Sequence, residues 1–190
     1  MSDDIKSLLQ DGQQARREGR LPDAKRLYVQ AVELSRAESD LLLIAQSVTR
    51  LGVSERDLGN VESALGHYRE ALAIYRGLDD PLALAHTVRH LGDILRGSGQ
   101  LEAARPCYAE ALEIYRTHPE TGTLDLANTL RGMALLGAAL GNTDEAIKLW
   151  TEAGALYDQV WQEPNSPFTQ ADLAPGVEEG KRQVALLAGA

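Results

Sequence analysis

The stretch LGDILRGSGQLEAARPCYAEALEIYR, which runs from Leu91 to Arg116, decides the fold of this chain. Its apolar residues recur every three or four positions on both sides of Gly99, which is the pattern of two amphipathic helices. Glycine is the common residue just beyond the end of a helix. Because the turn is short, the second helix folds back antiparallel to the first. Related stretches precede and follow this one, so we interpret the chain as an array of helix pairs.

Five kinds of position define the repeat. The mid-helix small residues of the first helices are Gly12, Gly52, Gly92 and Ala134, and the glycines that close those helices are Gly19, Gly59, Gly99 and Gly141. The second helices carry the alanines Ala24, Ala64, Ala104 and Ala146, at separations of 40, 40 and 42 residues, and seven residues later Ala31, Ala71, Ala111 and Ala153. Between the alanines lie the aromatic residues Tyr28, Tyr68, Tyr108 and Trp150. Glycine inside a helix costs roughly 1 kcal/mol relative to alanine. We therefore expect the paired helices to approach closely there, with the aromatic ring filling the adjacent space.

This pattern resembles the tetratricopeptide repeat over about Ile5–Tyr157, and the best match is in Leu51–Tyr75 and Leu91–Tyr115. The spacing is longer than the common repeat of about 34 residues, and is similar to the long repeats of kinesin light chains and cell-polarity scaffolds. The resemblance implies an all-α, right-handed α-solenoid of four helix hairpins and a C-terminal capping helix, in a single domain over residues 1–190. The expected repeats cover about 5–37, 41–77, 81–117 and 124–160, and a loop at Gln162–Pro167 precedes the capping helix at about 171–188.

Composition excludes several classes of function. The chain has 190 residues, a net charge of −9 and an isoelectric point near 4.9, which disfavours nucleic acid and anionic membranes as partners. Cys107 is the single cysteine, and the N-terminus has no apolar signal segment. No nucleotide-binding, nucleophile or zinc-protease motif occurs. We expect a cytoplasmic, non-enzymatic protein without a cofactor or metal, since His86 and His90 lack a third ligand beyond Asp93.

Arrays of this kind bind partners in a groove lined by their first helices. Helical geometry places the residues one after, three before and four after each mid-helix small residue on the face opposite the second helix. The candidate groove residues are Arg16, Gln46, Thr49, Arg50, Arg56, His86, Arg89, His90, Asp93, Arg96, Asn128 and Arg131, and the same face includes Gln13, Arg17, Val53 and Leu135. Arginine pairs well with carboxylates. The sequence therefore predicts a protein or peptide partner that presents acidic groups or a terminal carboxylate.

Two alternatives stay open. The groove arginines can pair within the chain, since Arg89 and Asp93 are four residues apart and Asp93 and Arg96 three apart. The chain can also self-associate through exposed faces of its terminal helices. A chaperone-tail clamp is disfavoured because Leu9 and Gln13 stand where such members of the family carry polar clamp residues. Glu55 stands where Leu95 stands one repeat later, and a half-buried carboxylate there is expected to need an arginine partner. The tyrosine column Tyr75, Tyr115 and Tyr157 is expected to pack between repeats.

Overall fold

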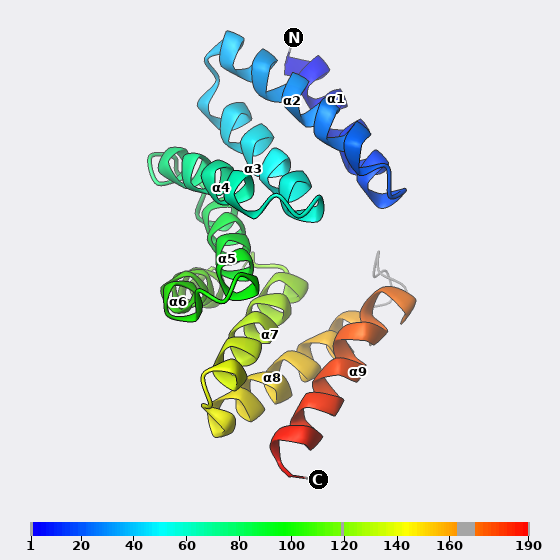
Figure 1. Cartoon of the computed structure of the whole chain (residues 1–190), viewed down its shortest axis with the longest axis vertical. Coiled ribbons are helices and arrows are strands. Elements are labelled where there is room, and N and C mark those ends of the chain that lie inside the picture. Colours follow the sequence, from blue (N-terminus) through cyan, green and yellow to red (C-terminus); the bar gives the residue numbers. More distant parts are fainter. Residues whose placement is uncertain (1, 119, 163–169, 190) are drawn as a thin grey trace. The chain divides into compact units, whose positions relative to one another are not determined.

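The computed structural model describes residues 2–118, 120–162 and 170–189, and every regular element in these ranges is a helix (Figure 1). The elements are α1 (Ser2–Arg17), α2 (Leu21–Glu38), α3 (Leu41–Asp57), α4 (Val61–Tyr75), α5 (Pro81–Gly97), α6 (Leu101–Thr117), α7 (Thr123–Ala139), α8 (Thr143–Gln162) and α9 (Gln170–Leu187). The predicted all-α array of four helix pairs and a terminal helix is confirmed. The predicted loop lies outside the described residues from 163 onward.

The turn inside each pair is made by a glycine in the left-handed region. Gly19, Gly59, Gly99 and Gly141 have φ values of 76°, 81°, 78° and 79°. At Gly59 the amide donates to the carbonyl of Arg56 at 2.9 Å, and the next amide, of Asn60, donates to the carbonyl of Glu55 at 2.8 Å. These bonds satisfy carbonyls at the end of α3 and reverse the chain direction. The second helix then starts only two residues beyond the glycine.

Close approach of glycine and tyrosine holds the pairs together, as predicted. A Cβ atom at Gly12 would lie 2.5 Å from the ring of Tyr28, and one at Gly52 would lie 3.1 Å from the ring of Tyr68. Both rings are almost completely buried. The ring of Tyr108 lies against Gly132 in the first helix of the following pair. The aromatic column therefore also joins successive pairs.

The chain divides into two compact units, Met1–Ile94 and Leu95–Ala190. In the first unit, Ala15, Tyr28 and Val48 belong to one buried apolar cluster contributed by α1, α2 and α3. In the second unit, Leu130 and Trp150 belong to a cluster contributed by α7 and α8 that extends to α9. The single-domain organisation stays a prediction.

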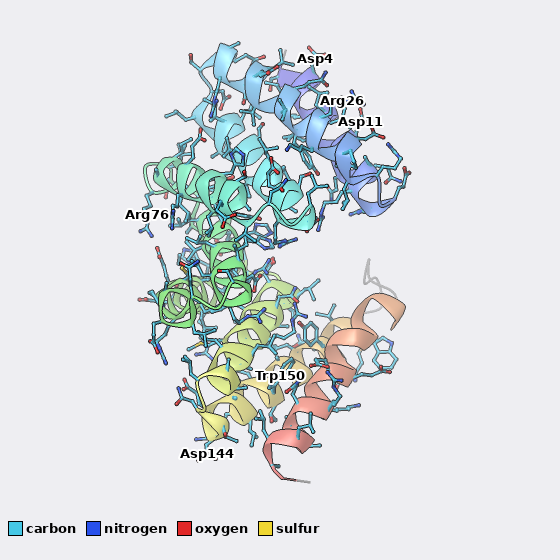
Figure 2. The ribbon with its side chains drawn as sticks, viewed as in Figure 1. Asp4, Asp11, Arg26, Arg76, Asp144 and Trp150 are labelled. Atoms are coloured by element: carbon cyan, nitrogen blue, oxygen red, sulfur yellow. The ribbon has the colours of Figure 1, made fainter. Side chains whose placement is uncertain are left out.

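Helix α9 covers the last helix pair. Val177 is buried, and Val184 and Leu187 pack against the same cluster. Gly180 lets α9 approach Trp150, which is labelled in Figure 2: a Cβ atom at Gly180 would lie 3.3 Å from the Trp150 ring. One turn earlier, a Cβ atom at Gly176 would lie 3.1 Å from the ring of Tyr157. The predicted capping helix thus packs along α8 (Figure 1).

Candidate functional site: a cavity between first helices

The first unit contains a cavity of about 440 Å³, which we name the first-helix cavity. It is lined by Lys6, Leu9, Gln10, Gln13, Gln46, Thr49, Arg50, Tyr75, Ala83, His86 and Thr87. These residues come from the first helices α1, α3 and α5, with Tyr75 from α4. Four of the predicted groove residues therefore line one space: Gln46, Thr49, Arg50 and His86.

The lining is positive and rich in amides. Lys6 and Arg50 are its cations, and no carboxylate is among the lining residues. Arg50 makes no hydrogen bond or ion pair with any residue that the structure describes. His86 adds no charge at neutral pH, because burial and then the neighbouring His90, Arg89 and Arg50 lower its pKa to about 2. The cavity can therefore accept anionic groups at Lys6 and Arg50 and hydrogen-bond a polar chain through the glutamine side chains.

Arg16 and Arg56 both form ion pairs with the carboxylate of Asp57. Arg16 Nε donates to Asp57 Oδ2 at 2.5 Å, and Arg56 Nη2 donates to Asp57 Oδ1 at 2.8 Å. Burial alone would raise the pKa of Asp57, but the two arginine hydrogen bonds outweigh it and the pKa is lowered. Asp57 is therefore ionised at neutral pH and neutralises part of the arginine charge. Arg16 and Arg56 are therefore paired within the chain, which is one of the two alternatives left open by the sequence.

A second internal network joins Arg89, His90 and Asp93 on α5. Arg89 is 7% exposed and donates to Asp93 Oδ2 at 3.1 Å. Its other terminal nitrogen lies 3.0 Å from Nε2 of His90, which in turn lies 3.3 Å from Nε2 of His86. Burial, followed by the charge of Arg89, lowers the pKa of His90 to about 4. Within the described residues, no group of three possible metal ligands is assembled.

The predicted residues of the second unit have partners of their own. Arg96 Nε donates to the hydroxyl of Tyr108 at 3.2 Å, and the hydroxyl of Tyr157 donates to Oδ1 of Asn128 at 2.8 Å. The Nε of Arg131 is buried without a hydrogen-bond partner among the described residues. Arg96 thus contacts the aromatic residue twelve positions later in the sequence, whereas Arg56, at the equivalent position one repeat earlier, pairs with Asp57.

The expected arginine partner of Glu55 is wrong. Glu55 is 5% exposed, and its carboxylate accepts from Asn60 Nδ2 at 2.7 Å and pairs with Lys25 Nζ at 2.9 Å. Lys25 lies on α2, so this pair joins the second helix of one repeat to the first helix of the next. A lysine serves here because its long stem reaches across while its head stays partly in solvent.

Two features of the site escaped the sequence reasoning. Lys6 and Gln10 line the cavity but lie nearer the start of α1 than the predicted face, which began at Gln13. Ion pairs also join second helices: Arg36 pairs with Glu70 at 2.6 Å, and Arg116 pairs with Glu152 at 2.8 Å. The spacing that reveals these pairs was present in the sequence, since the arginines are 80 residues apart and the glutamates 82.

The chain is similar in sequence to one protein family and in fold to a solved structure. A family model described as "Tetratricopeptide repeat" matches residues 7–77 and 81–159. The crystal structure of BtubC (BKLC) from P. vanneervenii is similar, with a TM-score of 0.75 and 22% sequence identity, over 94% of this chain and 70% of that chain. At this identity, the likeness concerns the fold. No curated protein matches the sequence. Across the described residues, we find no helix with the length and apolar character needed to cross a membrane.

Proposed function

Because the chain belongs to the tetratricopeptide-repeat family, whose repeats generally mediate protein–protein interactions in typically non-enzymatic scaffolds, we propose that it is an interaction scaffold that holds an acidic peptide segment in the first-helix cavity. Carboxylates of the segment contact Lys6 and Arg50. The side-chain amides of Gln10, Gln13 and Gln46 hydrogen-bond its backbone, for which glutamine offers both a donor and an acceptor.

The charge of the cavity lining carries this proposal. Two cations and no carboxylate line the space, although the whole chain has a net charge of −9. Salt screens the distant negative charges beyond about 8–10 Å, so the nearby cations dominate the potential felt by a bound carboxylate. Arg50 favours an anion further, since among the described residues it has no carboxylate to release before binding one.

The neighbouring arginines contribute differently. Arg16, Arg56 and Arg89 are held by Asp57 and Asp93, so three cations face two anions. This network supplies a small positive excess beside the cavity and keeps the arginine side chains in place. We therefore assign direct contact with the ligand to Lys6 and Arg50, and a background potential to the paired arginines.

A matched pair of peptides tests the proposal. One fluorescein-labelled peptide contains glycine, serine and aspartate, and its counterpart has asparagine at each aspartate position. Fluorescence anisotropy with the full chain at low salt is expected to show tighter binding of the aspartate peptide. The double variant Lys6→Glu/Arg50→Glu is expected to lose about tenfold in affinity for it, because charge-assisted hydrogen bonds are replaced by repulsion.

A charge reversal outside the cavity serves as the control for the double variant. Arg69 is exposed on α4 and does not line the cavity, so Arg69→Glu is expected to leave the preference for aspartate intact. Equal affinity of the wild-type chain for the two peptides would contradict an acidic ligand. Binding that survives the double variant unchanged would place the peptide outside the cavity.

A further inference from the structure

A second surface of the molecule is apolar and open. A groove of about 510 Å³ runs between α8 and α9 and is named here the α8–α9 groove. It is lined by Trp150, Thr151, Gly154, Ala155, Asp158, Val177, Gly180, Lys181, Val184, Ala185 and Ala188. Most of these side chains are small or apolar, so another helix can approach the groove closely.

Helix α9 occupies the place of the first helix of a fifth pair. Gly176 of α9 lies against the ring of Tyr157, and Gly180 lies against the ring of Trp150. In the same way, Gly132 of α7 lies against the ring of Tyr108 in the preceding second helix. Every earlier first helix is followed by a second helix, but the described residues provide none for α9. The α8–α9 groove therefore stands where such a second helix would pack.

Neighbouring second helices of this chain are joined by an arginine–glutamate pair. Arg36 of α2 pairs with Glu70 of α4, and Arg116 of α6 pairs with Glu152 of α8. One repeat after Arg116, 42 residues later, the sequence has Asp158 instead of arginine. Asp158 lines the groove and makes no ion pair with the part of the chain that the structure describes. The charge offered to the next helix is thus reversed.

We propose that the α8–α9 groove docks an amphipathic helix of a partner protein that carries lysine or arginine opposite Asp158. The groove supplies an apolar floor and one edge carboxylate, which matches a helix with an apolar stripe and a flanking basic residue. This surface uses other residues than the first-helix cavity, and its partner is basic where the cavity ligand is acidic.

A second copy of the chain fits the groove less well. Its second helices α4, α6 and α8 carry Glu70, Glu110 and Glu152 at the position that would meet Asp158, and like charges repel. Its α2 carries the neutral Gln30 there, but α2 is already packed against α1 and α3. The reversed charge therefore disfavours extension of the array by its own repeats.

A peptide taken from the chain itself provides the test. The fluorescein-labelled sequence Val61–Tyr75 is made with Glu70 retained and with Glu70→Lys, and both are titrated with the full chain by fluorescence anisotropy. We expect the lysine peptide to bind about fivefold more tightly, the range of a partly exposed ion pair. The variant Asp158→Arg is expected to reverse this order, because it restores the arginine–glutamate pair of the inner repeats.

Two further variants locate the effect. Glu178→Arg changes the same charge on α9 outside the groove lining and is expected to leave the order of the peptides unchanged. Ala155→Trp fills the groove and is expected to abolish binding of both peptides while thermal melting shows a folded chain. Equal affinities of the two peptides, or an order unaffected by Asp158→Arg, would overturn the proposal. So would sedimentation that shows a dimer of the full chain lost in Ala155→Trp, since the groove would then hold a second copy.

Discussion

At the scale of single residues, the glycine–tyrosine contacts do the most to set the geometry of a pair. Two helical glycines of the first unit make a matched test. Gly12→Ala places a methyl group 2.5 Å from the buried ring of Tyr28, whereas Gly66→Ala meets nothing within 4 Å. We expect Gly12→Ala to lower the free energy of unfolding by about 1–3 kcal/mol through overpacking. Gly66→Ala is expected to raise it by about 0.5–1 kcal/mol through helix propensity. Urea unfolding of both variants measures the difference, and equal effects would contradict the close packing.

The histidine pair His86 and His90 makes stability depend on pH. Burial lowers their pKa values from 6.5 to about 2 and about 4, so the unfolded chain binds protons more readily than the folded chain as the pH falls. The free energy of unfolding is therefore highest above pH 6.5 and falls progressively below that pH. From pH 7 to 5 we expect the two histidines together to lower the free energy of unfolding by an amount on the order of 4 kcal/mol.

The variant His86→Gln/His90→Gln is the control for this loss. It removes both titrating groups, and its urea unfolding is expected to change much less between the same pH values. His67 remains with a pKa lowered by burial, so a small slope persists. Arg56, Arg89, Arg50 and Asp93 are the charged groups around the pair. A double variant with the full slope of the parent would show that other groups cause the acid sensitivity.

At the scale of helices, the buried pair between Lys25 and Glu55 joins α2 to α3. Burial raises the pKa of Glu55, but the hydrogen bonds from Lys25 and Asn60 lower it below 4.5, so the carboxylate is charged. Lys25→Met removes its counter-ion and is expected to cost about 1–3 kcal/mol. Glu55→Leu copies Leu95, the residue one repeat later, and leaves a lysine that returns to solvent.

We expect Glu55→Leu to be neutral or stabilising, because a buried charge is replaced by a packed apolar group. The two variants are compared by urea unfolding at neutral pH. If Glu55→Leu destabilised the chain more than Lys25→Met, the buried carboxylate would itself be a source of stability. That outcome would contradict the view that the position tolerates either residue.

The element scale also explains where the sequence prediction of the site stopped. Helical geometry placed Gln46, Thr49, Arg50 and His86 on the same face of their helices, and these four residues line one cavity. It could not show that Asp57 lies against Arg16, because that contact depends on how α1 and α3 cross. Periodicity within one helix fixes the face of a residue, whereas its partner on the next helix depends on packing.

At the scale of the whole molecule, the fold was predictable because each structural signal, such as the turn glycine, occurs once in every repeat. The glycines at Gly19, Gly59, Gly99 and Gly141 each adopt the left-handed turn that their spacing predicted. A single such glycine would have been ambiguous, but four at a regular interval fix the length and direction of every helix pair. The residue types at the candidate groove positions differ between repeats, so no such repetition supports the site.

The terminal helix α9 covers apolar residues of the last helix pair. Deletion of Ala171–Ala190 removes Val177, Val184 and Leu187 from the apolar cluster around Trp150. Uncovered apolar surface favours aggregation, and we expect the melting temperature to fall by about 5 °C or more. Circular dichroism and light scattering measure both effects. Removal of Ala188–Ala190 alone leaves the cluster contacts in place and is expected to have little effect. A chain without α9 that melts with the full chain and stays monodisperse would show that α8 does not need α9 to cover its apolar face.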